Sequence, residues 1–211
     1  MLSILSKRLR VTSLTDRDFM LAFTNHWFKY AIILISLIPE DILKFLITDE
    51  IFQLVMRHGD TVLLMSLFEK SSQSFQQSIV EELLDHLVSI NDFNSFVNVL
   101  NTEIVNPEFF PNGETLLTNL LKEKNSKYCR AMINSAPNKR YIVMENNRGE
   151  TPLQIAIEKE LFDLIDAMIW NCEEHLNPEF NWHEPLVPLF QKLSVMTNTV
   201  FIDYFMSKFI D

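Results

Sequence analysis

The chain has 211 residues, of which 47% are hydrophobic and 22% are charged, so it falls among ordinary globular domains and outside disordered or fibrous proteins. It contains only three glycines, too few for the tight turns of a β-rich fold. Its formal net charge of −10 repels phosphate backbones and argues against a nucleic-acid partner.

The N-terminal segment, residues 1–58, is predicted to be helical. Apolar residues recur along it at helical spacing, and acidic residues open two of the helices, after Thr15 and after Pro39. Acidic side chains favour the first turn because they complement the positive end of the helix dipole. We expect helices over residues 16–27, 28–37, 40–48 and 49–57.

The apolar stretches are too short to span a membrane. The longest, from Tyr30 to Ile38, covers nine residues, whereas a spanning helix requires about 20. At the N-terminus, Lys7 and Arg8 follow the apolar residues, whereas a secretory signal carries its charges before them. We therefore expect no transmembrane segment and no signal peptide, and the two cysteines suggest a reducing compartment.

Every glycine of the chain stands in the same local phrase. The phrase occurs as Gly59-Asp60-Thr61-Val62-Leu63, as Gly113-Glu114-Thr115-Leu116-Leu117 and as Gly149-Glu150-Thr151-Pro152-Leu153. The second and third copies are 36 residues apart, and at this offset the sequence at 131–133 repeats at 167–169. We therefore expect an internal repeat with two helices in each copy.

The phrase has the chemistry of a helix start. Thr151 is a good N-cap, Pro152 suits the first helical position, and Gln154 stands where it completes a capping box with Thr151. We expect Thr61 and Thr115 to cap the corresponding helices. The glycine that precedes each threonine would turn the chain with a positive φ.

The segment between the first two glycine phrases has an irregular length. Gly59 and Gly113 are 54 residues apart, which is too many for one repeat and too few for two. Apolar residues at helical spacing predict helices over 74–88 and 92–103. An inserted or elongated helix near 74–103 would account for the extra length.

Residues 177–211 are expected to form a degenerate repeat that caps the C-terminal end. The run Asn106-Pro107-Glu108-Phe109 recurs as Asn177-Pro178-Glu179-Phe180, and helical patterns follow it without the glycine phrase. End repeats of stacked arrays differ from internal ones because their outer face meets solvent. The expected organisation is a segment at 1–58, repeats at 59–176 and a capping repeat at 177–211.

The third copy of the phrase lies within a longer informative run. It reads Asn146-Asn147-Arg148-Gly149-Glu150-Thr151-Pro152-Leu153-Gln154-Ile155-Ala156-Ile157. This run resembles the ankyrin repeat, and the sequence departs from that family at Gln154, where histidine is usual, and at Glu160, where glycine is usual. The resemblance implies an all-α protein: a short ankyrin-like helical-repeat solenoid with an N-terminal helical segment.

The resemblance also implies a function, because ankyrin repeats bind proteins. It predicts a protein–protein interaction module that holds its partner on the concave face of the array. The anionic chain favours a partner with a neutral or basic surface. The family's variable surface positions, carried over to this sequence, give the predicted partner-binding residues Arg57, His58, Asp60, Phe68, Glu69, Pro111, Asn112, Glu114, Lys122, Glu123, Asn147, Arg148, Glu150, Glu158 and Lys159.

No pattern in the sequence indicates a metal, a cofactor or a catalytic group. Cys172 and His175 are the nearest pair of metal-ligating residues, and two ligands do not make a site. Cys129 falls at an apolar position of the repeat, so we interpret it as a buried structural residue. Asp85 and His86 are adjacent on a predicted helix and should therefore point to different faces.

Other functions stay open. We favour the interpretation that the chain is a binding protein. The alternative is an enzyme or toxin-like effector that has its chemistry in the N-terminal helices and uses the repeats for targeting. The Phe-, Ile- and Asn-rich composition is typical of an AT-rich genome, and with the repeats it is similar to effectors that intracellular bacteria deliver into host cells. The expected location is the cytoplasm, or the host-cell cytoplasm for such an effector. A self-associating assembly protein is a third alternative.

Overall fold

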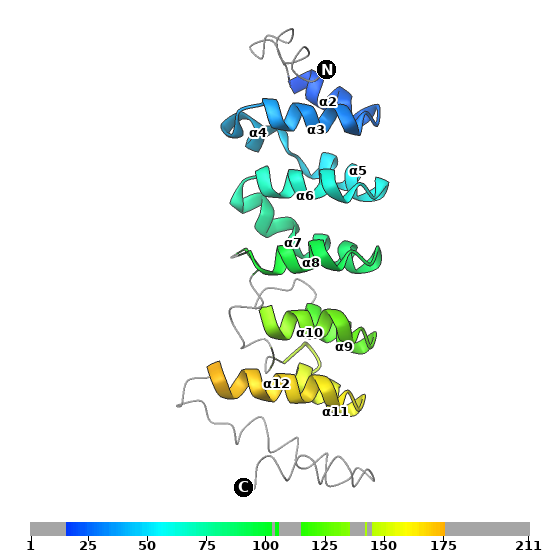
Figure 1. Cartoon of the computed structure of the whole chain (residues 1–211), viewed down its shortest axis with the longest axis vertical. Coiled ribbons are helices and arrows are strands. Elements are labelled where there is room, and N and C mark those ends of the chain that lie inside the picture. Colours follow the sequence, from blue (N-terminus) through cyan, green and yellow to red (C-terminus); the bar gives the residue numbers. More distant parts are fainter. Residues whose placement is uncertain (1–15, 103, 106–114, 136–141, 143–144, 176–211) are drawn as a thin grey trace, which may run out of the picture. The chain divides into compact units, whose positions relative to one another are not determined.

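The computed structural model describes residues 16–102, 104–105, 115–135, 142 and 145–175, and this part of the chain is helical with no strand (Figure 1). The prediction of an all-α protein is thus confirmed for the described residues. The chain divides into two compact units, Met1–Val99 and Leu100–Asp211. The helices, in chain order, are α2 (Asp16–Thr24), α3 (Phe28–Leu37), α4 (Glu40–Leu46), α5 (Asp49–His58), α6 (Thr61–Lys70), α7 (Gln73–Ser89), α8 (Phe93–Leu100), α9 (Leu116–Lys122), α10 (Ser126–Ser135), α11 (Pro152–Glu158) and α12 (Phe162–His175).

The four helices expected in the N-terminal segment are present as α2 to α5, with bounds close to the predicted ones. Helix α5 illustrates why the sequence places them there. Asp49 and Glu50 occupy its first turn and Arg57 and His58 its last, so charges complement both ends of the helix dipole. Its apolar side is buried and consists of Ile51, Phe52, Val55 and Met56.

A recurring three-residue turn joins helices into pairs. His26, Asn91, Lys124 and Glu160 have left-handed backbone with φ of 57° or 58°. In each turn this residue donates its N–H to the carbonyl three residues back, and the next residue donates to the carbonyl five residues back. These two bonds form a Schellman motif, which satisfies the last carbonyls of the first helix. The second helix begins two residues after the left-handed residue in every case.

Gly59 has the same place in the pair formed by α5 and α6. Its φ is 72°, and its N–H donates to the carbonyls of Val55 and Met56. The left-handed turn residues therefore stand at positions 26, 59, 91, 124 and 160, with intervals of 33, 32, 33 and 36 residues. The described chain accordingly contains the pairs α2–α3, α5–α6, α7–α8, α9–α10 and α11–α12.

The left-handed conformation at Glu160 predicts a stabilising substitution. A residue with a Cβ atom is strained there, and Glu160→Gly removes the strain at the cost of some backbone entropy. The strain of about 1–2 kcal/mol exceeds the entropy cost of about 0.5–1 kcal/mol, so we expect the free energy of unfolding to rise by about 0.5–1 kcal/mol, measured by urea denaturation. Glu160→Ala keeps the Cβ atom and should give no such gain; an equal gain from alanine would contradict the assignment.

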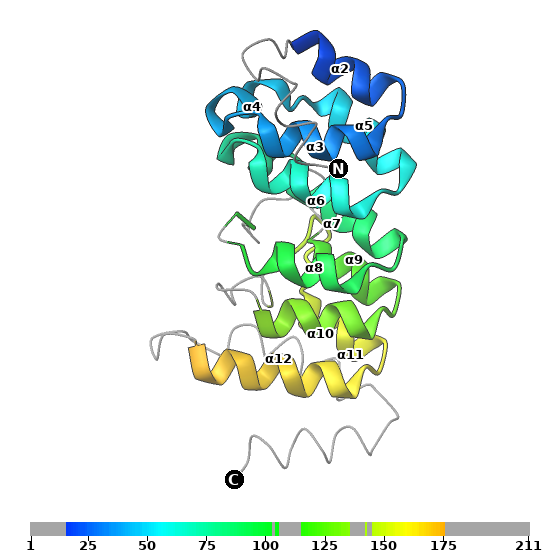
Figure 2. The same cartoon turned by 45° about the horizontal axis from the view of Figure 1, so that its top comes forward.

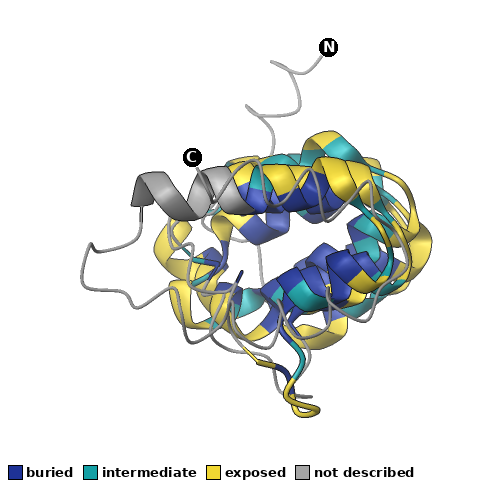
Figure 3. Cartoon of the chain, turned by 90° about the horizontal axis from the view of Figure 1, so that it is seen from below, coloured by how far each residue is buried: buried dark blue, intermediate teal, exposed yellow. Residues whose placement is uncertain are grey.

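Within each unit, successive pairs stack with like helices in contact. In the first unit α2 contacts α5 and α3 contacts α6; in the second unit α9 contacts α11 and α10 contacts α12 (Figure 2). Buried positions lie on the inward sides of the helices and exposed positions on their outward sides (Figure 3). The α2–α3 and α5–α6 pairs of the first unit, and the α9–α10 and α11–α12 pairs of the second, thus pack on each other with apolar residues buried.

The Gly59 phrase occupies a different position from the Gly149 phrase. Gly149, with φ of 70°, lies in the loop before the first helix of a pair, whereas Gly59 lies between the two helices of a pair. The 54-residue interval is therefore not one irregular repeat: it includes α6 and the whole α7–α8 pair. Within this interval α7 has 17 residues, close to the helix expected over 74–88. Residue 58, the expected end of the N-terminal segment, lies inside the α5–α6 pair.

Two expectations concern residues outside the described part. Gly113 and the predicted capping repeat at 177–211 both lie outside the residues that the structure describes. Among the helices that the structure describes, none has the combination of length and apolar character that crossing a bilayer requires.

Candidate functional site

The loop before α11 is built around the buried side chain of Asn146. Its Oδ1 accepts hydrogen bonds from the backbone N–H groups of Arg148 and Glu150, each at 2.9 Å, and its Nδ2 donates to Glu150 Oε2 at 3.0 Å. Two backbone bonds close the same turn, from Asn146 N–H to the Glu150 carbonyl and from Gly149 N–H to the Asn146 carbonyl. This loop is therefore held in one conformation and presents Asn147 and Arg148 at its exposed tip.

The predicted start of α11 is confirmed. Thr151 Oγ1 accepts from the Gln154 N–H at 3.2 Å, and Gln154 Oε1 accepts from the Thr151 N–H at 3.0 Å, which completes the capping box. Thr115 caps α9 as predicted. The prediction for Thr61 is wrong: Asp60 caps α6, because its Oδ1 accepts from the Leu63 N–H at 3.0 Å.

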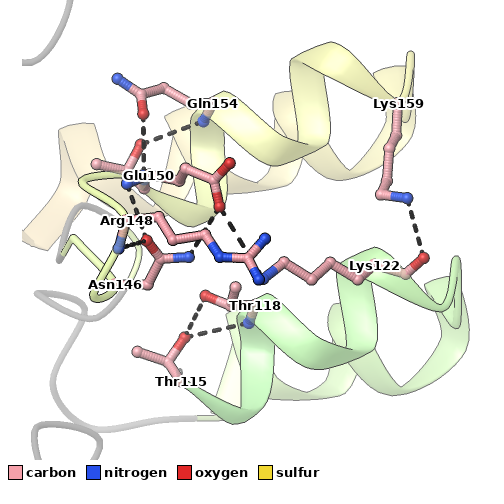
Figure 4. A network of polar contacts seen from close by, with 9 residues as sticks. Thr115, Thr118, Lys122, Asn146, Arg148, Glu150, Gln154 and Lys159 are labelled. Atoms are coloured by element: carbon pink, nitrogen blue, oxygen red, sulfur yellow. Dashed lines mark hydrogen bonds and ion pairs between the residues drawn. The ribbon is translucent and has the colours of Figure 1, made fainter. Parts of the chain in front are cut away.

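Three of the predicted partner-binding residues connect two stacked helices of the second unit. Lys159 Nζ donates to the Lys122 carbonyl at 3.0 Å, and Lys122 Nζ lies 4.0 Å from Glu150 Oε2 (Figure 4). These contacts join the ends of α9 and α11 to the loop before α11. Lys122, Glu150 and Lys159 are thus engaged in the packing of one pair on the next, each with a part-exposed side chain.

Four other predicted residues of the second unit are exposed: Glu123, Asn147, Arg148 and Glu158. Glu123 and Glu158 lie at the C-terminal ends of the first helices α9 and α11, and the other two lie on the Asn146 loop. We call this set the loop surface. The predicted residues Pro111, Asn112 and Glu114 lie outside the described part of the chain.

In the first unit most of the residues predicted to face a partner are exposed, but Phe68 is not. Arg57, His58 and Glu69 are exposed, and Asp60 is half-buried as the cap of α6. Phe68 is 1% exposed and belongs to the core. The physical reason is the position of the glycine phrase: it begins the second helix of a pair here, so the alignment with Gly149 assigned a core residue to the surface.

A hollow between α5 and α7 was not predicted from the sequence. It has a volume of about 480 Å³ and is lined by Gln53, Met56, Arg57, His58, Gly59, Glu82, Asp85, His86 and Ile90. Gln53 Nε2 donates to Glu82 Oε2 at 2.7 Å across one end of it. We call it the α5–α7 hollow. It contains two of the predicted partner-binding residues, Arg57 and His58.

Histidines gather at this edge of the first unit. The rings of His26 and His58 have their centroids 4.3 Å apart, and Phe28 packs edge-on against His58 at 4.7 Å. His86 lines the hollow together with Asp85, so these neighbours border the same depression although they are adjacent on α7. The Nε2 atom of His86 is buried and has no hydrogen-bond partner among the described residues.

Burial shifts the pKa values of two groups, one in each unit. Burial raises the pKa of Glu81 above its ordinary value, and the neighbouring charge of Asp85 raises it further. Burial also raises the pKa of the Cys129 thiol to about 12. Cys129 is buried, as the sequence predicted.

The raised pKa predicts that Cys129 is inert in the folded chain. The thiolate is the nucleophile, and with a pKa of about 12 only about one thiol in ten thousand is ionised at pH 8. A Cys172→Ser variant, in which Cys129 is the one remaining cysteine, should not react with a thiol reagent until urea unfolds it. Rapid reaction without denaturant would contradict the buried position.

The described residues contain no group of three or more His, Cys, Asp and Glu side chains placed to hold a metal ion. The side chains of Cys172 and His175 lie outside the described part of the chain. Comparison of the sequence with protein-family models, with curated proteins and with solved structures gave no match.

Proposed function

We propose that this chain is an ankyrin-like helical-repeat module that binds a protein partner. The observation that carries the proposal is the recurrence of the left-handed turn at intervals of 33, 32, 33 and 36 residues. An ankyrin repeat is about 33 residues long and contains one pair of helices. The contacts of like helices in successive pairs of each unit support the same assignment.

The partner is proposed to bind where the loops and first helices expose polar side chains. A loop whose backbone is fixed by Asn146 loses little conformational entropy on binding, which favours affinity. The loop surface and the α5–α7 hollow both lie on first helices or at their ends. The net charge of −10 favours a partner with a neutral or basic surface. The proposed setting is the cytoplasm of the producing cell or, for a secreted effector, of a host cell.

A charge-reversal experiment tests this proposal. The variant Arg148→Glu, Glu158→Lys keeps the net charge but reverses the sign of the charge at these two positions of the loop surface. Because both side chains are exposed, we expect the free energy of unfolding to change by no more than about 0.5 kcal/mol. Affinity capture from a eukaryotic lysate, with quantitative mass spectrometry, should recover a partner with the wild type and lose it with this variant.

The matched control is Arg130→Glu, Asp163→Lys. These exposed residues of the second helices α10 and α12 form an ion pair, with Arg130 Nη2 and Asp163 Oδ2 3.9 Å apart, and the exchange preserves the pair and the net charge. The control should retain the partner. Equal loss with both variants, or retention with both, would contradict the placement of the binding surface on the loops and first helices.

A further inference from the structure

The α5–α7 hollow has an apolar part and a carboxylate part. Met56 of α5 is buried beneath it and Ile90, at the end of α7, is exposed at its border. Glu82 and Asp85 are three residues apart, so they lie on the same side of α7. A volume of about 480 Å³ is within the range of sites that accommodate ligands, which is about 300–1,000 Å³.

Carboxylates outnumber the cationic side chain at this place. Among the lining residues, Arg57 contributes a permanent positive charge, whereas α7 contributes the carboxylates of Glu82 and Asp85. Glu81 precedes Glu82 on the same helix. Arg57 donates from Nε to the Gln53 carbonyl at 3.3 Å, and within the described residues no ion pair joins it to Glu82. Burial, and after it the charge of Asp85, raises the pKa of Glu81, so these two carboxylates repel each other. A further cation would relieve that repulsion.

Arginine and lysine side chains match both parts of such a site. Their methylene stems cover apolar surface while their charged heads reach polar groups. A guanidinium binds carboxylates through paired, charge-assisted hydrogen bonds. A free metal ion would leave the apolar part of the hollow uncovered, whereas a basic side chain of a protein segment covers it.

We infer that the α5–α7 hollow is the pocket that receives an arginine or lysine side chain from a segment of the partner protein. The inference rests on the proposed function and adds the chemistry of recognition: the stem lies over Met56 and Ile90, and the charged head lies between Glu82 and Asp85. It also gives the first unit a role in binding that is separate from the loop surface of the second.

The test uses the full chain and a random peptide library displayed on phage. Peptides selected on the wild type should be enriched in arginine or lysine, and synthetic copies should bind with a Kd measurable by fluorescence anisotropy. The variant Glu82→Gln, Asp85→Asn should weaken that binding at least tenfold. The variant Asp163→Asn, which removes an exposed carboxylate from the second helix α12 of the other unit, should leave it unchanged.

A second arm changes the peptide instead of the chain. Replacing an arginine of the peptide by citrulline, or a lysine by acetyl-lysine, removes the positive charge. This change should weaken binding to the wild type but have little further effect in Glu82→Gln, Asp85→Asn. This arm stays informative even if the protein variant fails to fold. The inference requires the neutral peptide to bind the wild-type chain more weakly, and that measurement does not use the variant.

The outcomes separate this inference from the proposed function. Selected peptides without basic residues, or with affinity that Glu82→Gln, Asp85→Asn leaves unchanged, would overturn the inference. If such peptides lose affinity with Arg148→Glu, Glu158→Lys, the proposed function stands without the pocket. If neither set of substitutions affects any peptide or lysate partner, both the function and the pocket are refuted.

Discussion

Leu153→Ala should destabilise the chain by roughly 2–5 kcal/mol, because Leu153 is 4% exposed and the substitution leaves a cavity. Leu153 follows Pro152 in the first turn of α11, the helix that packs against both α9 and α12. Truncation therefore removes a buried side chain from a helix that is packed on two sides. The free energy of unfolding is measured by urea denaturation followed by circular dichroism.

The matched control for this prediction is Leu21→Ala. Leu21 lies on α2 and is 41% exposed, so the same chemical change should cost less than about 1 kcal/mol. If Leu153→Ala were as stable as Leu21→Ala, the start of α11 would not be a buried helix start, and the loop surface placed beside it would have to be abandoned.

Phe68→Ala should cost about 3–5 kcal/mol, which is the usual range for deleting a buried aromatic ring. Phe68 is 1% exposed on α6, and its backbone carbonyl accepts a hydrogen bond of 2.6 Å from Gln76 Nε2. The loss of the ring removes core contacts at the place where α6 leads into α7. The result is read from the same urea titration.

The control for Phe68 is Phe45→Ala on α4. Phe45 is 85% exposed, so its removal should change the free energy of unfolding by less than about 0.5 kcal/mol. A small effect at Phe68, together with weaker partner binding, would restore Phe68 to the surface, where the sequence had placed it.

Much of the fold can be predicted from the sequence because its determinants are local. The helix starts at Asp49 and Thr151 depend on first-turn acids and on a capping box, which involve residues no more than a few positions apart. The long helix α7 follows from apolar spacing over 17 residues. Short-range chemistry of this kind is visible without any tertiary information.

The placement of the Gly59 phrase could not be deduced in the same way. A left-handed glycine and then a capping residue precede both α6, the second helix of its pair, and α11, the first helix of its pair, so the same glycine-acid-threonine phrase fits either start. The other turns have a left-handed residue that is not glycine, at His26, Asn91, Lys124 and Glu160. The interval of 32 to 36 residues between successive left-handed turns therefore cannot be found from the glycines and is apparent only in the structure.

The site was predicted only in part for a related reason. The exposure of Arg148 and Glu158 follows from the repeat pattern. The α5–α7 hollow depends on contacts such as Gln53 to Glu82, which join residues 29 positions apart. No local pattern predicts such a contact, and the same holds for the bond from Lys159 to Lys122, which spans 37 positions.

Hydrogen–deuterium exchange of the chain with its captured partner tests the central claim most directly. The account predicts that binding slows amide exchange in the loop before α11 and at the facing ends of α5 and α7. It predicts no change in the second helices α10 and α12. Slower exchange confined to α10 and α12, with none in the loop or in α5 and α7, would contradict recognition by the loops and first helices.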